Sequence, residues 1–208
     1  MGKGRTFRKH EVLALLEGRK TLMHLPIKGN IGNTVLRPPM YPVDDEYWWG
    51  PFGGEGGMSR QGFKPYYKVG DQIWVREKFM AGYNSSAGAI KYAADGHIHP
   101  GLGDFELMSW CMPVSMPQWA SRMTLEITDI STQHIQSITP LDLVESGIEV
   151  SNFEIDCNCE RCPRTIIECP PAVEVARAKF KVLWNKMHGT ESWDSNPVVW
   201  RYRFKRIK

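Results

Sequence analysis

Alternating apolar and polar positions predict strands in four parts of the chain. The clearest is 198–205, in which every second side chain is large and apolar. One face of that strand would hold Val198, Trp200, Tyr202 and Phe204, and the other Arg201, Arg203 and Lys205. Residues 123–128 alternate in the same way, 72–76 follow a Gly-Asp turn, and 89–93 form a further short apolar run. These strands are short and widely spaced along the sequence.

Two further segments repeat their apolar positions with the spacing of a helix. The first, 10–16, lies between Thr6, which we expect to cap it, and Gly18, which we expect to end it. The second, 173–187, follows the pair Pro170-Pro171 and carries an apolar stripe. The simplest interpretation of that stripe is a face packed against the rest of the protein.

A third, shorter helix is predicted from its first residues. Thr139 precedes Pro140, a residue favoured at the first helical position, and Asp142 lies three residues after Thr139. Gly147 is expected to end this helix. Short strands separated by a few helices predict an α+β protein built around a small β-barrel with flanking helices.

Residues 29–66 follow neither period and are rich in Gly, Pro and aromatic side chains. A stretch of this length without a periodic pattern is typical of a functional loop or a disordered insertion. The chain has 208 residues, which suits one decorated domain or two small ones. We expect a single domain over 1–208, with insertions at 29–66 and at 151–171.

Composition and charge exclude several classes of protein. The chain has 26 Lys and Arg against 23 Asp and Glu, which rules out a histone-like polycation but permits a local basic groove. Apolar residues make up 42%, enough for a sizeable core. No run of 18 apolar residues predicts a membrane span, and the first residues lack the apolar core of a signal peptide. We therefore expect a protein of the reducing cytoplasm of a bacterial cell, without a membrane partner.

Cysteine spacing predicts a metal site. Four of the five cysteines lie within 13 residues in the pattern C-x-C-x2-C-x6-C, namely Cys157, Cys159, Cys162 and Cys169. In a reducing compartment such a cluster indicates metal ligands rather than disulfides. Four thiolates suit a structural, tetrahedral zinc ion, because they leave no position open for water. The alternative is a cysteine-rich surface loop without metal.

Several blocks of residues, in this order, resemble the ASCH family of PUA-like domains. The first block is Gly18-Arg19-Lys20-Thr21, placed after a short helix, and the second is 69–77. Residues 116–127, 144–148 and 192–200 provide three more. Together the blocks are similar to the phage- and prophage-encoded branch of that family, and the resemblance as a whole extends over about 60% of the chain, in blocks from start to end, by rough count. The insertions at 29–66 and 151–171 lie outside the common core.

The resemblance implies a β-barrel with a cleft beside the first helix, in which family members are proposed to bind RNA or nucleotides. Some small members are amidohydrolases that act on N4-acetylcytidine, and another is reported as a ribonuclease. The resemblance carries the amidohydrolase Lys onto Lys20 and the Glu onto Glu145. Thr21 matches the other Thr of the motif, but Met23 stands where the working Thr would be.

The chemistry of these residue types leaves two interpretations open. Amide hydrolysis needs a nucleophile, a base and a donor for the developing oxyanion. A partly buried Lys20 with a lowered pKa would serve as base or donor, and Glu145 would hold it or shuttle a proton. The alternative is a structural ion pair between Lys20 and Glu145 at the mouth of the barrel, beside a cleft that only binds its ligand.

A cleft that binds a base needs aromatic side chains for stacking and polar groups for the edge of the base. Trp119 is the preferred stacking candidate because it follows Pro117 outside any predicted strand, whereas Trp74 lies within one. The other candidates for the base are Trp193, Asn196 and Glu77, and those for phosphates are Arg19, Arg76 and Arg122.

Three functional hypotheses follow. The first is a module that binds RNA, DNA or a modified nucleoside near Lys20. The second is a small hydrolase, either an amidohydrolase that acts on N4-acylated cytidine through Lys20 and Glu145 or a ribonuclease. The third is a phage protein that binds a host protein through 29–66. We prefer the first hypothesis, binding of a nucleic acid or a modified nucleoside.

Overall fold

The computed structural model describes residues 2–27, 41–42, 48–54, 57–81, 90–96, 109–150 and 169–208. Within these ranges the protein is α+β, as the sequence predicts. The strands are β1 (Lys3–Thr6), β2 (Leu22–Pro26), β3 (Tyr41–Pro42), β4 (Trp48–Gly54), β5 (Gly57–Phe63), β6 (Gln72–Arg76), β7 (Phe79–Ala81), β8 (Ile90–Tyr92), β9 (Thr124–His134) and β10 (Val198–Arg206). The α-helices are α1 (Lys9–Leu16), α2 (Pro140–Glu145) and α3 (Pro170–His188). Short 3₁₀ helices are η1 (Ala93–Asp95), η3 (Pro113–Ser115), η4 (Gln118–Ala120) and η5 (Ile135–Ser137).

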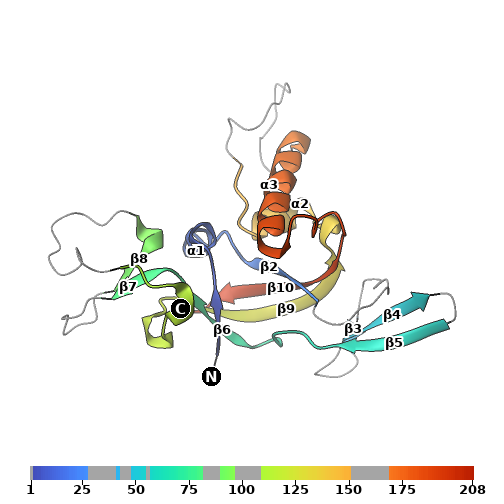
Figure 1. The fold of residues 1–208 in the computed structure, drawn as a ribbon, viewed down its shortest axis with the longest axis horizontal. Coiled ribbons are helices and arrows are strands. Elements are labelled where there is room, and N and C mark those ends of the chain that lie inside the picture. The colour runs from blue at the N-terminus through green and yellow to red at the C-terminus, as the bar shows by residue number, and fades with distance from the viewer. Residues whose placement is uncertain are drawn as a thin grey trace.

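The central element is a five-stranded sheet with the order β1-β6-β9-β10-β2 (Figure 1). β1 runs parallel to β6, and the other neighbours are antiparallel. Among the described residues β1 and β2 are the two edge strands and do not pair with each other. The closed barrel expected from the sequence is therefore not formed by this part of the chain, because no hydrogen-bonded ladder joins its two ends.

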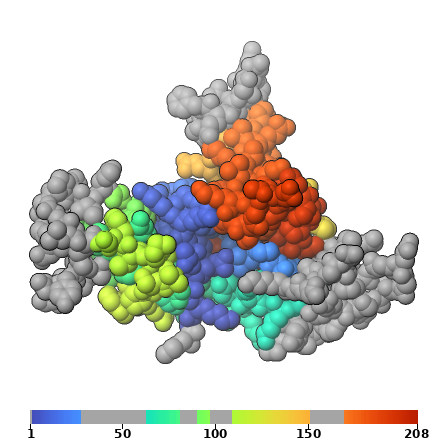
Figure 2. All heavy atoms as spheres, viewed as in Figure 1, coloured from blue at the N-terminus to red at the C-terminus, as the bar shows by residue number. Residues whose placement is uncertain are grey.

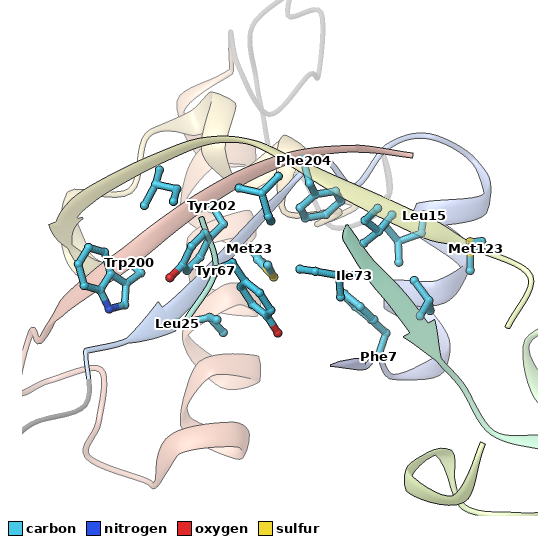
Figure 3. Packing of buried hydrophobic residues seen from close by; sticks show 14 of the residues in the cluster. Phe7, Leu15, Met23, Leu25, Tyr67, Ile73, Met123, Trp200, Tyr202 and Phe204 are labelled. Carbon is cyan, nitrogen blue, oxygen red and sulfur yellow. The ribbon is translucent and has the colours of Figure 1, made fainter. Parts of the chain in front are cut away.

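Side-chain alternation on β10 divides the protein into two apolar clusters. Trp200, Tyr202 and Phe204 face the main core, together with β2, β6 and α1. Figure 3 shows the strands arching over this core, with Met23 and Leu25 of β2 among its side chains. Val199 lies on the opposite face and packs in the second cluster, which α2 and α3 cover. The predicted alternation of this strand is confirmed.

Local sequence signals explain where the helices begin. Thr139 Oγ1 accepts a hydrogen bond from the Asp142 amide, and the Asp142 carboxylate accepts one from the Thr139 amide, both at 3.1 Å. This capping box is the one predicted. The prediction that Thr6 caps the first helix is wrong, because α1 begins after Arg8, whose backbone N–H donates to the Glu11 carboxylate at 3.0 Å.

The segment 29–66 contains strands, which the sequence does not predict. Its described residues include β3, β4 and β5, which form a three-stranded antiparallel sheet. β4 and β5 pair from Trp48–Phe63 to Gly54–Gly57 and project away from the central sheet (Figure 1). Gly and Pro residues interrupt the alternation of apolar and polar positions in this segment, so the sequence pattern does not indicate the hairpin. β7 and β8 form a separate two-stranded ladder that includes the strand predicted at 89–93.

Candidate functional site

A cavity of about 110 Å³ lies at the open seam of the sheet, between its edge strands β1 and β2. The end of β1 and the start of α1 form one wall, β2 forms the second, and α3 forms the third. Its lining residues are Arg5, Thr6, Phe7, Glu11, Lys20, Met23, His24, Leu25, Ser146, Phe180, Trp184, Met187 and His188. We call this space the seam cavity. Figure 2 shows the N-terminal residues in blue directly against α3 in orange and red.

The turn after α1 brings Lys20 into this cavity. Gly18 has a φ of 73° and ends α1, and the Lys20 amide then donates to the Ala14 carbonyl at 3.0 Å. Lys20 and Ser146 form an isolated antiparallel bridge. Gly147 permits this approach, since a Cβ atom there would lie 2.8 Å from the Ala14 Cβ. The Gly residues near Lys20 and after α2 therefore place the Lys20 side chain beside Ser146.

Lys20 is buried with a carboxylate partner. Its Nζ donates to the Ser146 carbonyl at 2.9 Å and lies 3.4 Å from Glu11 Oε1, with only 7% of the residue exposed. Burial lowers the pKa of Lys20, and Glu11 offsets only part of that shift. Burial alone would raise the pKa of Glu11, but Lys20 and the Arg8 amide hold it below its usual value. The pair is therefore a low-dielectric site in which a buried amine, paired with a carboxylate, lines a cavity.

The predicted partner of Lys20, Glu145, points elsewhere. Its Oε1 accepts a hydrogen bond from Arg203 at 2.8 Å, and its Oε2 lies 3.9 Å from Arg201. Asp142, one turn earlier on α2, binds Arg201 in the same way, so this face of α2 is paired with β10. Glu145 reaches the Lys20 region only through its carbonyl, which accepts from the Thr21 amide at 2.8 Å.

Glu11 is the carboxylate beside Lys20 that sequence reasoning missed. The available signal was its position three residues after Arg8, at the start of an amphipathic helix. That signal indicates a helix cap. The sequence separation of Glu11 and Lys20 does not show that the chain reverses direction between them and brings their side chains together. The resemblance pointed to Glu145 because the motif gives order along the chain rather than side-chain direction.

His24 is a second residue that sequence reasoning passed over. It lies on β2 with its ring edge against Phe180, and its Nε2 is 3.1 Å from Gln133 Nε2. Burial lowers the pKa of His24 to about 3; Asp142 opposes this shift, while Lys20 and Arg201 add to it. The imidazole is therefore neutral near pH 7. Its Nδ1 has no hydrogen-bond partner among the described residues.

Positive charge gathers around the cavity from different elements. Arg5 on β1 and Lys20 both line it, against the single carboxylate of Glu11. No ion pair or hydrogen bond within the described ranges engages the Arg5 guanidinium. At the end of α3, burial lowers the pKa of His188, and Arg5 and Arg8 lower it further. The cavity is thus suited to an electron-rich or anionic ligand.

Aromatic side chains form the α3 wall. Phe180 and Trp184 are stacked with centroids 6.4 Å apart, and the ring of His188 lies 4.1 Å from that of Trp184. These residues recur at i and i+4 on one helix face, so the apolar stripe predicted at 173–187 serves both packing and the cavity. Met23, at the position where the family motif has Thr, lines the cavity and also packs in the core.

Two predicted ligand residues, Arg122 and Glu77, form a network away from this cavity. Arg122 binds Glu77 through Nε at 2.8 Å and Nη2 at 2.9 Å, and it reaches Asp95 through Nη1 at 2.7 Å. Its guanidinium also lies 4.1 Å from the centroid of Tyr92. Arg76 lies 4.5 Å above the ring of Trp74. Burial raises the pKa of Glu77, and Arg122 offsets only part of this shift.

The remaining predicted residues are dispersed. Trp193 is buried against Phe180 behind the cavity wall, and Trp119 is 69% exposed on η4. Asn196, with a φ of 45°, accepts from the Gln136 amide through Oδ1 and shapes the turn before β10. Arg19 pairs with Glu17 on the outer side of α1. The structure therefore brings only Lys20 of the predicted set into the seam cavity.

A larger hollow is a groove of about 750 Å³ between α1 and α3. Its walls are mainly apolar, including Leu13, Val182 and Leu183, and its charges include the pair of Arg19 and Glu17. No buried side-chain atom without a partner lines it within the described ranges. Polar chemistry is therefore concentrated in the smaller seam cavity.

Of the predicted zinc ligands, Cys157, Cys159 and Cys162 lie outside the described residues. Cys169 is described; it is buried directly before α3 and packs against Ala172. Within the described ranges no three His, Cys, Asp or Glu side chains gather as a metal site would require. The zinc site stays a prediction. In the same ranges no helix has the length and apolar character of a membrane span.

Comparison with known proteins gave no match: no family model, no curated protein and no solved structure is similar to this chain at a significant level.

Proposed function

We propose that this protein binds a nucleobase-bearing ligand, either a modified nucleoside or one nucleotide of an RNA or DNA strand, with the base in the seam cavity. The observation that carries this proposal is the small cavity at the sheet seam, with Lys20 and aromatic α3 side chains in its walls. At about 110 Å³ it is smaller than the ~300 Å³ lower bound of drug-sized sites. It therefore suits a flat group, with the sugar and phosphate outside.

The charge and aromatic character of the walls support the same proposal. The rings of Phe180 and Trp184 provide apolar surface for a base, and π surface accepts any base. Lys20 provides a donor for a carbonyl oxygen, and Arg5 at the rim provides a cation for phosphate. We further propose that the open sheet is a PUA-like core of the ASCH type whose seam forms the ligand site.

The test is calorimetric titration with nucleosides, N4-acetylcytidine included, and with short RNA and DNA, comparing the wild type with Lys20→Met. We expect Lys20→Met to weaken binding at least about tenfold, because it removes a buried charged donor. Lys181→Met is the matched control: Lys181 pairs with Asp194 on the surface and does not line the cavity. Circular dichroism checks that both variants are folded, since Glu11 loses its partner in Lys20→Met.

Salt and product analysis separate the alternatives. If phosphates contribute, affinity falls steeply with salt, whereas a nucleoside bound without phosphate contacts is nearly insensitive to salt. Mass spectrometry of the same mixtures detects hydrolysis of an acyl group or of RNA. A product that Lys20→Met abolishes would make the protein a hydrolase. If no ligand in the panel binds, the proposal fails, and the 29–66 segment with a host protein becomes the hypothesis to pursue.

A further inference from the structure

We propose that Ser146 and His24 are the residues that recognise the polar edge of the ligand, and that this edge presents hydrogen-bond acceptors on a single ring. This inference rests on the proposed function, because it concerns the same cavity. Neither residue belongs to the set of predicted ligand residues, although Ser146 lies in the 144–148 block. Both line the seam cavity, Ser146 from the end of α2 and His24 from β2.

Both residues hold a buried polar atom without a partner. Ser146 is 8% exposed and His24 is 7% exposed, and neither Ser146 Oγ nor His24 Nδ1 has a hydrogen-bond partner among the described residues. Leaving a buried donor or acceptor unpaired costs about 1–3 kcal/mol, so such atoms are uncommon in folded proteins. Two of them in the walls of one cavity indicate that a ligand completes their hydrogen bonds.

The neighbour of His24 determines what the ligand must offer. Gln133 directs its amide nitrogen, which only donates, at His24 Nε2, so Nε2 is the acceptor and the proton of the neutral ring lies on Nδ1. The unpartnered atom is therefore a donor that needs an acceptor. With this amide orientation, His24 selects a carbonyl oxygen or a ring nitrogen without hydrogen.

Ser146 lies beside a second source of donors. Its own carbonyl accepts from Lys20 Nζ at 2.9 Å, and both residues line the seam cavity. Lys20 has three N–H groups and is engaged by the Ser146 carbonyl and Glu11. Lys20, His24 and Ser146 thus offer mainly donors, which suits a ligand edge with adjacent acceptors.

The size of the cavity decides between one ring and two. At about 110 Å³ it is well below the ~300 Å³ at which sites for drug-sized ligands begin, which favours the smaller of the two ring systems. A pyrimidine with a carbonyl oxygen next to a ring nitrogen matches the donors of the walls. A purine adds a second ring, and we expect it to bind more weakly in this small space.

Ser121 provides a matched comparison for Ser146. It is also buried, at 4% exposed, but its hydroxyl lies 2.8 Å from the Val75 carbonyl and 2.9 Å from the Met123 carbonyl, and it does not line the seam cavity. A serine hydroxyl that supports the fold and one that is reserved for a ligand should respond in opposite ways to removal.

The experiment measures melting temperature and binding of cytidine, uridine, adenosine and guanosine by calorimetry for Ser146→Ala and Ser121→Ala. We expect Ser146→Ala to leave the melting temperature unchanged or raised and to weaken pyrimidine binding about five- to tenfold. Ser121→Ala should lower the melting temperature and leave the affinity unchanged.

A pair of His24 variants tests the second residue. An Asn side-chain nitrogen can take the place of Nδ1, and a Gln side chain that of Nε2. We therefore expect His24→Asn to keep most of the affinity and His24→Gln to lose about five- to tenfold while it keeps the contact with Gln133.

Three results would overturn the inference. Ser146→Ala with wild-type affinity would show that the hydroxyl does not touch the ligand. Tighter binding of purines than of pyrimidines would refute the single-ring ligand. If the wild type binds a nucleic acid but none of the four nucleosides, the proposed function stands and the inference about Ser146 and His24 fails. If the wild type binds neither nucleic acids nor nucleosides, the proposed function and this inference both fail.

Discussion

Two buried charged clusters in this protein differ in how completely they are paired. In the cluster of Arg122, Glu77 and Asp95, each Glu77 oxygen receives a guanidinium N–H, and the remaining terminal nitrogen binds Asp95. The cluster of Lys20, Glu11, Ser146 and His24 has one ion pair at 3.4 Å and two polar atoms without partners in the described residues. A complete network holds the fold together, whereas an incomplete one beside a cavity retains hydrogen-bonding capacity for a ligand.

The largest expected effect tests the complete cluster. Arg122→Ala leaves the carboxylate of Glu77, which is 2% exposed, without its partner. We expect the free energy of unfolding to fall by about 3 kcal/mol or more, because an unpaired buried charge is costly. Urea denaturation measures this loss, and nucleoside affinity of the folded protein should not change.

The surface pair of Lys205 and Glu126, at 2.9 Å, is the control for that experiment. Lys205→Ala should cost less than about 1 kcal/mol, since exposed ion pairs contribute little. If Arg122→Ala remains as stable as Lys205→Ala, or if it abolishes nucleoside binding while folded, the comparison between the two clusters is wrong.

The next effect is a pH dependence from the incomplete cluster. The pKa of His24 is about 3 in the folded protein, against about 6.5 in the unfolded chain. The unfolded chain therefore takes up a proton that the folded protein excludes, and stability falls as the pH drops below about 6.5. Between about pH 6.5 and pH 5 this residue alone should cost about 2 kcal/mol.

His24→Gln isolates this contribution. Burial lowers the pKa of His10 and His188 as well, so the wild type should lose more than His24 alone explains. Denaturation curves at several pH values should show a shallower acid loss for the variant. Parallel curves for the two proteins would mean that His24 becomes protonated in the folded state near its ordinary pKa.

The smallest expected effect concerns Trp119, the preferred stacking residue from sequence. Because it is 69% exposed on η4 and does not line the seam cavity, Trp119→Ala should change stability by less than about 0.5 kcal/mol. Calorimetry should find nucleoside affinity unchanged. A tenfold loss would instead place a ligand surface on η4 and contradict the seam cavity as the site of the base.

Local patterns accounted for much of the fold. The alternation of β10, the capping box at Thr139 and the length of α3 were all predicted, because each depends on residues within a few positions of one another. The strands within 29–66 were not, since Gly and Pro remove the period that would reveal them. Barrel closure was a wrong expectation for the described residues, because the pairing of β1 with β2 is a long-range property.

The candidate site also combines features that local sequence predicts with features that depend on long-range contacts. Lys20 was chosen as a site residue from its motif, and it lines the seam cavity; its role stays a prediction. Glu11, His24 and Ser146 were not identified as site residues. What distinguishes Glu11 is that its carboxylate points toward Lys20, and what distinguishes His24 is the tautomer of its ring. Ser146 is distinguished by a hydroxyl without a hydrogen-bond partner among the described residues. Arg122 and Glu77 were chosen as ligand residues from their types alone, yet they bind each other.

The sequence by itself therefore predicted the three α-helices, four of the strands and one cation of the candidate site. Periodicity, capping residues and the turn at Gly18 act over a few residues, where chain geometry restricts the outcome. The tertiary structure decided which carboxylate meets Lys20, which polar atoms stay unpaired and where the cavity lies. Those outcomes depend on contacts between β1, β2, α2 and α3, and such long-range packing leaves no local pattern in the sequence.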